Sequence, residues 1–320
     1  MKLVMLPPQT DVTQGWARRL AATLPQVEVV VAEGGQQAQH EIVDADAAYG
    51  VLTPDLLARA TRLRWLQAPQ AAPPAGFYFP ALVAHPVVVT NFREIFNDHI
   101  GAHIMPFVFG FARGFHYYLP QQMRREWAKP PEDQGVVDLH SATALVVGLG
   151  GIGAEAARLL AAAGVKVIGT DARRTEVPAH VAEMHRPEAL DGLLGRADFV
   201  ISTVPHTPAT EGMFDRARFR RMRRGAFFIN IGRGMTTRLD DLAAALAAGE
   251  IAGAGLDVYE VEPLPADHVL WTMPGVMMTP HMGGYGPHLN ERRYRILCDN
   301  ARALVDGGAM RNVVDKESWF

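Results

Sequence analysis

The sequence of 320 residues contains one cysteine, Cys298, and no uninterrupted apolar run approaching the roughly 18 residues that a membrane span requires. A single cysteine excludes a disulfide within the chain and fits a reducing compartment. The apolar stretch at residues 1–7 is too short for a signal peptide. We therefore expect a cytoplasmic protein with no membrane partner.

An excess of positive charge is also absent. The chain has 31 Lys and Arg residues against 34 Asp and Glu residues, and its net charge of −3 argues against general nucleic-acid binding. With 48% hydrophobic and 20% charged residues, the composition is typical of a globular protein, and the length suggests two domains. These properties favour an enzyme or a binding protein for small molecules.

The stretch from Ala144 to Leu160 carries the strongest motif. An apolar, β-branched run leads into the pattern G-x-G-x-x-G and continues as an Ala- and Leu-rich segment of helical composition. Strand, glycine turn and helix in this order predict a dinucleotide-binding site in which the helix N-terminus faces the pyrophosphate. The residues expected to contact the dinucleotide here are Gly148, Gly150, Gly151, Ile152 and Gly153.

A second apolar strand, at residues 165–170, runs into Asp171. The spacing from the glycines is close to the roughly 20 residues at which an acid binds the ribose hydroxyls of NAD. This carboxylate should repel the 2′-phosphate of NADP, whereas Arg173 and Arg174 just beyond it could attract that phosphate. Because contact between a carboxylate and a phosphate is costly, we expect NAD as the cofactor in preference to NADP.

The rest of the chain predicts two α/β domains. Strands and helices alternate through the first hundred residues without a glycine motif, which predicts a separate domain with a parallel sheet. A mostly apolar segment, Ile100–Tyr118, predicts one long helix that joins the two domains. A final helix at residues 289–305 has the period to pack back on the first domain. We expect one domain from residues 1–98 and 287–320, and a dinucleotide-binding domain at residues 99–286.

Three polar residues, Arg233, Glu262 and His281, follow apolar strands in the second half of the chain. Ligands bind outside the carboxyl ends of the strands in an open parallel sheet, so these side chains can converge from distant parts of the sequence. Arginine offers a planar fork of donors to a carboxylate, and histidine exchanges protons near neutral pH. Glu262 could accept a hydrogen bond from the other ring nitrogen of His281. The set suits hydride transfer to a carbonyl, which needs a proton donor and an anchor for a charged substrate.

A metal site is the alternative interpretation of two histidines, His99 and His103, at the start of the predicted long helix. Their i, i+4 spacing would allow both rings to bind one metal ion. No third ligand is evident in the sequence, and the H-E-x-x-H pattern is absent. Capping and packing are therefore the preferred roles, and no metal site is predicted.

Taken together, the motifs resemble those of the D-isomer-specific 2-hydroxyacid dehydrogenase family, which includes phosphoglycerate, glyoxylate/hydroxypyruvate and D-lactate dehydrogenases. The matching segments span roughly half the chain in the order and spacing of the family. They are the glycine motif with Asp171, and residues 229–234 (I-N-I-G-R-G), 255–263 (G-L-D-V-Y-E-V-E-P) and 279–284 (T-P-H-M-G-G).

The resemblance implies an α/β fold of two Rossmann-like domains: a discontinuous, flavodoxin-like substrate domain and an inserted, doubly wound NAD(P)-binding domain. It implies Arg233 as substrate anchor, His281 as acid/base and Glu262 as its partner, with Glu262 preferred to Glu260 because it precedes the proline. It also implies a homodimer through the cofactor domain. The further residues that it assigns to the cofactor are Thr203, Val204, Pro205, Ile231, Gly232, Asp257 and Gly283.

The chain departs from the family pattern at several positions. Where the family has an Ala-Gly turn whose N–H groups bind the substrate carboxylate, this chain has Gln70-Ala71-Ala72, so Ala71 and Ala72 are the expected substrate contacts. Glu94 stands where glycine is frequent, and Arg238 stands where Asp commonly follows the Arg-Gly turn. These changes leave the substrate less defined than the reaction.

We expect an oxidoreductase that transfers hydride between NAD(P)H and C2 of a 2-keto acid or D-2-hydroxy acid. One alternative in the same class is oxidation of another small anion, such as formate or phosphite. Formate enzymes of this type pair their histidine with glutamine, whereas Glu262 is an acid. An alternative in a different class is a cofactor-sensing binding protein, like the corepressors on the same scaffold. Turnover of a panel of keto acids would distinguish an enzyme from a sensor.

Overall fold

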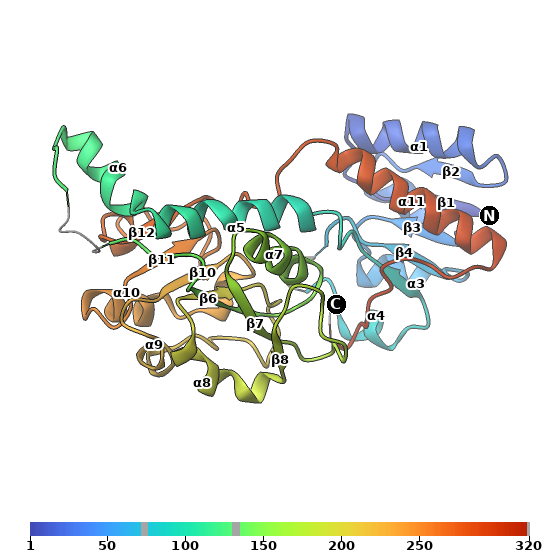
Figure 1. The fold of residues 1–320 in the computed structure, drawn as a ribbon. Helices are drawn as coiled ribbons and strands as arrows, with labels where there is room; N and C mark the ends of the chain where they lie inside the picture. The colour runs from blue at the N-terminus through green and yellow to red at the C-terminus, as the bar shows by residue number, and fades with distance from the viewer. Residues whose placement is uncertain (72–75, 130–134, 319–320) are drawn as a thin grey trace. The chain divides into compact units, whose positions relative to one another are not determined.

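The computed structural model describes residues 1–71, 76–129 and 135–318 (Figure 1). The chain divides into two compact units: Met1–Ile95 with Pro287–Phe320, called the terminal unit, and Phe96–Gly286, called the inserted unit. Each unit is built on a parallel sheet with helices on both faces. The predicted α/β fold with two Rossmann-like domains is therefore confirmed.

The terminal unit has a five-stranded parallel sheet in the order β2-β1-β3-β4-β5, which is the flavodoxin-like order. Its strands are β1 (Lys2–Met5), β2 (Glu28–Val31), β3 (Ala47–Tyr49), β4 (Trp65–Gln67) and β5 (Val88–Thr90). Its helices are α1 (Asp11–Thr23), α2 (Gly35–Glu41), α3 (Pro54–Arg59), α4 (Pro80–Ala84) and α11 (Leu289–Asp306).

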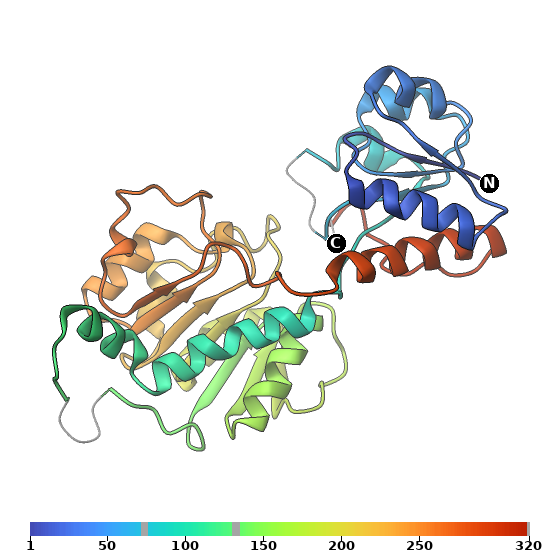
Figure 2. The ribbon, with the colours of Figure 1, turned by 90° about the horizontal axis from the view of Figure 1, so that it is seen from above.

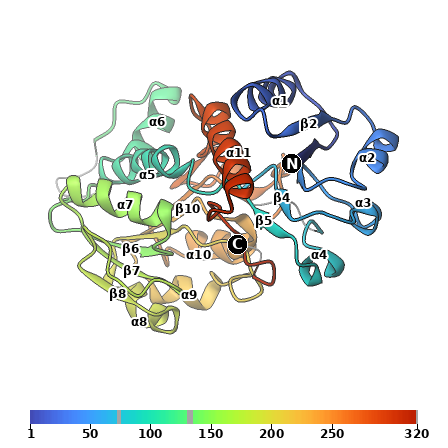
Figure 3. The same cartoon turned by 90° about the vertical axis from the view of Figure 1, so that its right-hand side faces the viewer.

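Helix α11 shows how the C-terminal segment joins this sheet. It lies beside α1 (Figure 3). The Arg19 guanidinium bonds the Glu291 carboxylate at 2.8 Å and stacks 3.7 Å above the Tyr294 ring. On the buried side of α11, the amide of Asn300 donates to the side-chain oxygen of Gln67 on β4. Because Gln67 and Asn300 are both fully buried, each requires such a partner.

The inserted unit has a seven-stranded parallel sheet in the order β12-β11-β10-β9-β6-β7-β8. This order is the doubly wound nucleotide-binding arrangement with one additional strand at the β12 edge. The strands are β6 (Thr143–Val147), β7 (Lys166–Thr170), β8 (Glu183–His185), β9 (Phe199–Ser202), β10 (Phe227–Asn230), β11 (Gly253–Leu256) and β12 (Val276–Met278).

Two layers of helices cover the sheet of the inserted unit. Helices α5 and α7 contact each other on one face (Figure 2), where Ile104 and Leu160 are fully buried. Helices α8, α9 and α10 supply the core of the other face through Leu190, Phe219 and Leu242. The bounds are α5 (Asn97–Ala112), α6 (Phe115–Arg124), α7 (Gly151–Ala162), α8 (Leu190–Leu193), α9 (Arg216–Arg221) and α10 (Leu239–Ala247), with 3₁₀ turns η1 (Pro187–Ala189), η2 (Leu194–Arg196), η3 (Gly234–Thr236) and η4 (Val269–Trp271).

The prediction of one helix over Ile100–Tyr118 was wrong. The helical path breaks after α5 because Gly114 has a φ of 72°, a left-handed conformation that glycine adopts without steric cost. Helix α6 then leaves the sheet (Figure 1) and exposes a run of large apolar side chains. They include Phe115, Tyr117, Leu119 and Met123.

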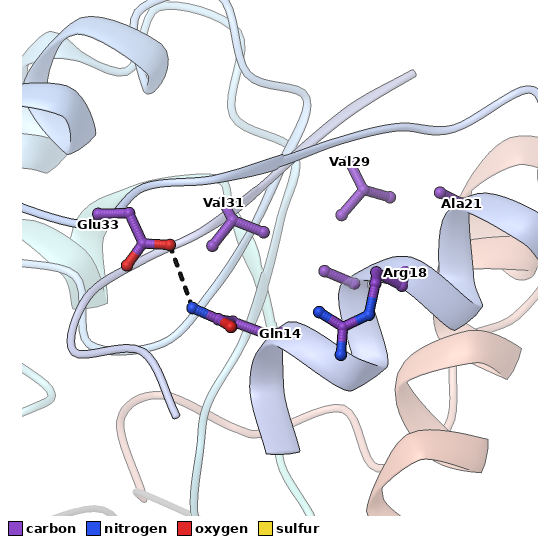
Figure 4. Close-up of a pocket in the computed structure, with 7 residues that line it drawn as sticks. Gln14, Arg18, Ala21, Val29, Val31 and Glu33 are labelled. Atoms are coloured by element: carbon purple, nitrogen blue, oxygen red, sulfur yellow. Dashed lines mark hydrogen bonds between the residues drawn. The ribbon is translucent and has the colours of Figure 1, made fainter. Parts of the chain in front are cut away.

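Two further features complete the description. No helix within the described ranges has both the length and the apolar character needed to cross a membrane. A pocket in the terminal unit lies between α1 and the edge strand β2 (Figure 4). Gln14 and Glu33 bond across it at 3.2 Å, and none of the expected site residues lines it.

Candidate active site

The glycine turn after β6 is shaped by close backbone contacts. Gly148 has a φ of 96°, which favours glycine, and a Cβ on Gly153 would overlap the carbonyl oxygen of Gly148. Thr203, at the end of β9, donates its hydroxyl to that same oxygen at 2.6 Å. The turn is therefore fastened to the neighbouring strand, and substitution of Gly153 would break it.

The start of α7 has the features of an anion site. Gly150 is its N-cap, no side chain among the described residues caps it, and a Cβ on Gly150 would meet no atom within 4 Å. The first N–H groups of a helix carry partial positive charge and bind phosphate where no side chain occupies them. Gly151 and Ile152 form the first turn of α7. These residues fit the pyrophosphate of a dinucleotide.

Asp171, just after β7, is bonded to the glycine turn. Its Oδ2 accepts from the N–H of Leu149 at 2.9 Å, and its Oδ1 accepts from the N–H groups of Arg173 and Arg174 at 2.8 and 2.7 Å. Each carboxylate oxygen has two lone pairs, so acceptor capacity remains for ribose hydroxyls. The carboxylate thus supports the turn and retains a lone pair that fits a ribose hydroxyl.

The segments after β9 and β10 lie against each other. Val204 and Pro205 follow Thr203, and the Pro205 carbonyl accepts from the Thr210 hydroxyl at 2.7 Å. Ile231 is buried, and its N–H bonds Ser202 on β9 at 3.2 Å. A Cβ on Gly232 would lie 2.6 Å from the carbonyl oxygen of Val204. The expected cofactor residues of these two segments therefore share one edge of the sheet.

Arg233 is positioned by the buried Asn230 at the end of β10. The Asn230 amide donates to the carbonyl of Arg233 and to two threonine hydroxyls, at 3.0–3.3 Å, and its oxygen accepts from the N–H of Gly232. Burial lowers the pKa of the Arg233 guanidinium, and the nearby Glu262 carboxylate acts in the opposite direction. The guanidinium still carries its charge at neutral pH. A half-buried cation beside one carboxylate is suited to bind a second anion.

Glu262 and His281 form a close pair. Nδ1 of His281 lies 2.6 Å from Oε2 of Glu262, and both side chains are partly exposed. The other carboxylate oxygen, Oε1, accepts from the N–H of Tyr259 at 3.0 Å, which fixes the orientation of the carboxylate. With Nδ1 donating to Glu262, Nε2 is the ring nitrogen left to exchange a proton with a ligand. This arrangement suits a general acid/base.

Asp257, after β11, is buried and holds the loop that carries His281. Its carboxylate accepts from the N–H groups of Met282 and Gly283, both at 2.8 Å, and from the Thr279 hydroxyl at 2.7 Å. Burial acts to raise the pKa of Asp257, but hydrogen bonds from His103, Thr279 and the two N–H groups outweigh burial and lower it. An ionised Asp257 therefore anchors this loop.

Glu260 has a separate role that explains the departure at Arg238. Arg238 is the N-cap of α10 and makes no side-chain capping bond. Glu260 supplies the missing acceptor, because its Oε2 accepts from the N–H of Leu239 at 2.7 Å. The structure thus assigns Glu260 to the α10 terminus and brings Glu262 to His281.

The expected substrate turn belongs to the terminal unit. The Ala71 carbonyl accepts from the Asn91 side chain at 2.9 Å, whereas Ala72 lies outside the described residues. Glu94, where the family often has glycine, has a φ of 73° and therefore adopts the conformation that glycine would favour. The bond from Asn91, which directly follows β5, therefore holds Ala71 near the end of that strand.

Four residues for which the sequence predicted no role in the site support it. Asn230, Tyr259, Thr279 and His103 contact the segments that hold the expected catalytic side chains. Three of these four lie within the quoted motifs, so their position in the motif was the available signal. His103 had only its helical spacing, and its partner Thr279 is 176 residues away.

Two parallel sheets, a glycine turn that fits a pyrophosphate and an acid/base pair define the class: an NAD(P)-dependent oxidoreductase. Residues 105–283 match the family described as D-isomer specific 2-hydroxyacid dehydrogenase, NAD binding domain. The chain belongs to the D-isomer specific 2-hydroxyacid dehydrogenase family, and the predicted resemblance and enzyme class are confirmed.

Named relatives agree with this class. The glyoxylate/hydroxypyruvate reductase B of Klebsiella pneumoniae (strain 342) is 34% identical over 248 residues, which cover 76% of this chain and 75% of that one. A D-isomer specific 2-hydroxyacid dehydrogenase from Xanthobacter autotrophicus Py2, solved with NADPH and MES, is 29% identical, with a TM-score of 0.83 over 100% of this chain and 99% of that one. The NADPH-dependent glyoxylate/hydroxypyruvate reductase of Sinorhizobium meliloti, solved with NADP and sulfate, is 26% identical, with a TM-score of 0.81 over 100% and 99%.

Proposed function

We propose that this enzyme interconverts small 2-keto acids and D-2-hydroxy acids, with glyoxylate and hydroxypyruvate as the first substrates to test. The observation that carries the proposal is the 2.6 Å pair of His281 and Glu262. The names of the relatives support the choice of substrate. In this proposal Ala71 and Ala72, which belong to the terminal unit by their place in the chain, contact the substrate, and the inserted unit binds the dinucleotide.

Each catalytic side chain has a defined task. When bound, the nicotinamide supplies or accepts the hydride at C2. Arg233 binds the substrate carboxylate and polarises the keto group, since a guanidinium can offer parallel N–H donors to a carboxylate. Nε2 of His281 delivers a proton to the C2 oxygen during reduction and removes it during oxidation. Glu262 accepts from Nδ1 and stabilises the imidazolium.

The direct test uses His281→Ala and Arg233→Ala. Consumption of NADH or NADPH is followed by absorbance in the presence of glyoxylate, hydroxypyruvate, pyruvate or a bulkier keto acid. We expect both variants to lose most of the turnover while their melting temperatures stay near that of the parent. Near-normal rates in either variant would refute the assignment.

The alternatives have less support. The formate interpretation is disfavoured by the acid at Glu262, and the relatives named as reductases favour an enzyme over a sensor. Tight dinucleotide binding without turnover of any keto acid or small anion would favour the sensor over the enzyme.

For the cofactor, we propose that NADH is used in preference to NADPH. The support is the Asp171 carboxylate, which would face a 2′-phosphate at the ribose position. The relatives solved with NADPH or NADP favour the opposite choice. The measurement is the ratio of kcat/KM for the two cofactors, and equal values would overturn the preference. Asp171→Ala should lower the ratio of kcat/KM for NADH to that for NADPH, because the loosened glycine turn affects both cofactors whereas the removed charge favours NADPH alone.

We also propose a cytoplasmic homodimer formed through the inserted unit. Leu119 and Met123 are one helical turn apart on α6 and are 49% and 85% exposed, and Trp127 is 93% exposed. Exposed apolar side chains in such number are typical of a protein interface. Sedimentation should show a dimer for the parent and a monomer for the Leu119→Glu/Met123→Glu variant. A monomeric parent would contradict the proposal.

A further inference from the structure

The backbone of His281 is held in an uncommon conformation. Its φ is 50°, in the left-handed region that residues with a side chain rarely adopt. Such a conformation persists when surrounding contacts determine it. The N–H of His281 donates to the Thr279 carbonyl at 3.0 Å, and the next two N–H groups, of Met282 and Gly283, donate to Asp257. Thr279 and Asp257 therefore hold the loop on both sides of the ring.

Thr279 connects these contacts. Its carbonyl accepts from His281 and from the Tyr259 hydroxyl, the latter at 2.9 Å. Its side-chain hydroxyl donates to Oδ1 of Asp257 at 2.7 Å. Since a hydroxyl has one proton, this bond uses the only donor of the Thr279 side chain. The hydroxyl oxygen can then act only as an acceptor toward any other neighbour.

The other neighbour is His103 on α5. Its Nε2 lies 3.0 Å from the Thr279 hydroxyl oxygen and 3.4 Å from Oδ1 of Asp257. Because neither oxygen has a proton to offer, Nε2 of His103 must carry the proton and donate it. The ring is mostly buried and packs edge-on against Phe107, with centroids 5.5 Å apart. Its Cδ2 lies 3.1 Å from the place a Cβ on Gly283 would occupy.

We propose that His103 is a positioning residue for His281. Its Nε2–H directs the Thr279 hydroxyl toward Asp257, and Asp257 in turn keeps its oxygens on the N–H groups that follow His281. His103 has no part in the proton transfer itself. The inference rests on the proposed role of His281 as the acid/base.

The consequence concerns the chemical step. If Nε2 of His281 is displaced from its productive position, the transition state is stabilised less. Binding of the dinucleotide and of the substrate carboxylate does not change, because other groups make those contacts. Loss of the His103 donor should therefore lower kcat and kcat/KM together and leave KM unchanged. A purely structural role would instead lower stability or alter all parameters.

The experiment compares His103→Phe, His103→Gln and Thr279→Val in the full-length enzyme. Phenylalanine keeps a ring against Phe107 and removes the donor, whereas glutamine keeps a donor within reach of Thr279. We expect His103→Phe to lower kcat about tenfold, which is the rate change that corresponds to the stabilisation given by one hydrogen bond. His103→Gln should recover most of that loss. The dissociation constant for NADH, measured by fluorescence, should not change.

The double variant His103→Phe/Thr279→Val tests the route. If both residues act through one chain of hydrogen bonds, the double variant loses no more kcat than the worse single variant. Multiplied losses, an unchanged kcat in His103→Phe or no recovery in His103→Gln would each overturn the inference. Melting temperatures identify a variant that fails to fold, and Thr279→Val, which keeps the side-chain shape, then carries the test with His103→Gln.

The two proposals fail separately. His281→Ala is measured beside the His103 variants. If His281→Ala stays active, the proposed acid/base role is wrong and this inference falls with it. If His281→Ala is inactive and His103→Phe is normal, only the positioning role of His103 is wrong.

Discussion

Replacing Glu262 with glutamine should impair catalysis, because it would exchange donor and acceptor in the hydrogen bond between this side chain and Nδ1 of His281. Oε1 of Glu262 accepts from the N–H of Tyr259, so the amide oxygen of the glutamine would take that place. The amide nitrogen would then face Nδ1 of His281, where Oε2 lies now at 2.6 Å. An amide nitrogen donates and cannot accept, so the imidazole would have to accept at Nδ1 and could not be stabilised as imidazolium.

The size of the effect follows from the bond that is lost. A hydrogen bond to a charged group contributes about 1.5–3 kcal/mol, and each 1.36 kcal/mol is about tenfold in rate. Discounting for the partial exposure of both side chains, we expect kcat/KM for the keto acid to fall about 10- to 100-fold in Glu262→Gln. The melting temperature should change little, because Tyr259 keeps an acceptor.

The assay is the initial rate of keto acid reduction at saturating reduced nicotinamide. Glu260→Gln is a matched control, since the same change two residues away leaves an amide oxygen to accept from Leu239 at the start of α10. Its kcat/KM should stay within about twofold of the parent, as expected for an exposed site that keeps its acceptor. Rates for Glu262→Gln within the same range, or an equal loss in Glu260→Gln, would refute the pairing.

Further predictions concern the glycine turn and the pH dependence of stability. Gly150→Ala should keep the melting temperature, because its Cβ meets no atom of the protein, and should weaken NADH binding, measured by fluorescence, because the Cβ occupies the space proposed for the pyrophosphate. Gly153→Ala should lower the melting temperature, because its Cβ overlaps the carbonyl oxygen of Gly148. An unchanged NADH affinity in Gly150→Ala would contradict the phosphate site. Hydrogen bonds from Arg216 chiefly lower the pKa of Glu250 to about 2 from its ordinary 4.5, so its stabilising contribution is complete above pH 4.5 and disappears as the pH falls toward 2. The melting temperature of Glu250→Gln should therefore lie below that of the parent at pH 7 and converge with it near pH 2; a constant difference across this range would exclude the linkage.

The sequence could predict what is decided locally. Apolar runs followed by glycine or an acid place β6, the glycine turn and Asp171, because the strand, the tight turn and the helix each require those residue types. Thr53 and Pro54 likewise predict the start of α3, where the Thr53 hydroxyl accepts from the N–H of Leu56.

Other features depend on partners far along the chain. His103 and Thr279 bond to each other although they are 176 residues apart in the sequence, and no local pattern predicts this contact. Strand β8 has only three residues, Glu-Met-His, which is too short to show a periodic apolar pattern. The break between α5 and α6 falls at Gly114 within an apolar stretch whose composition reads as continuous helix. Long-range pairing decides the first two cases, and in the third the conformation of a single glycine outweighs the helical composition around it.

The bond between Asp171 and the N–H of Leu149 constrains any change of cofactor. The side chain that would discriminate between the two ribose forms also anchors the turn that would bind the pyrophosphate. A substitution of Asp171 meant only to admit a 2′-phosphate would therefore also loosen the glycine turn, which is the part of the site proposed to bind the pyrophosphate. Asparagine removes the charge but has a single side-chain oxygen, so it can accept from Leu149 or from Arg173 and Arg174 but not from both sides. A change of cofactor through this residue alone therefore weakens the turn in either case.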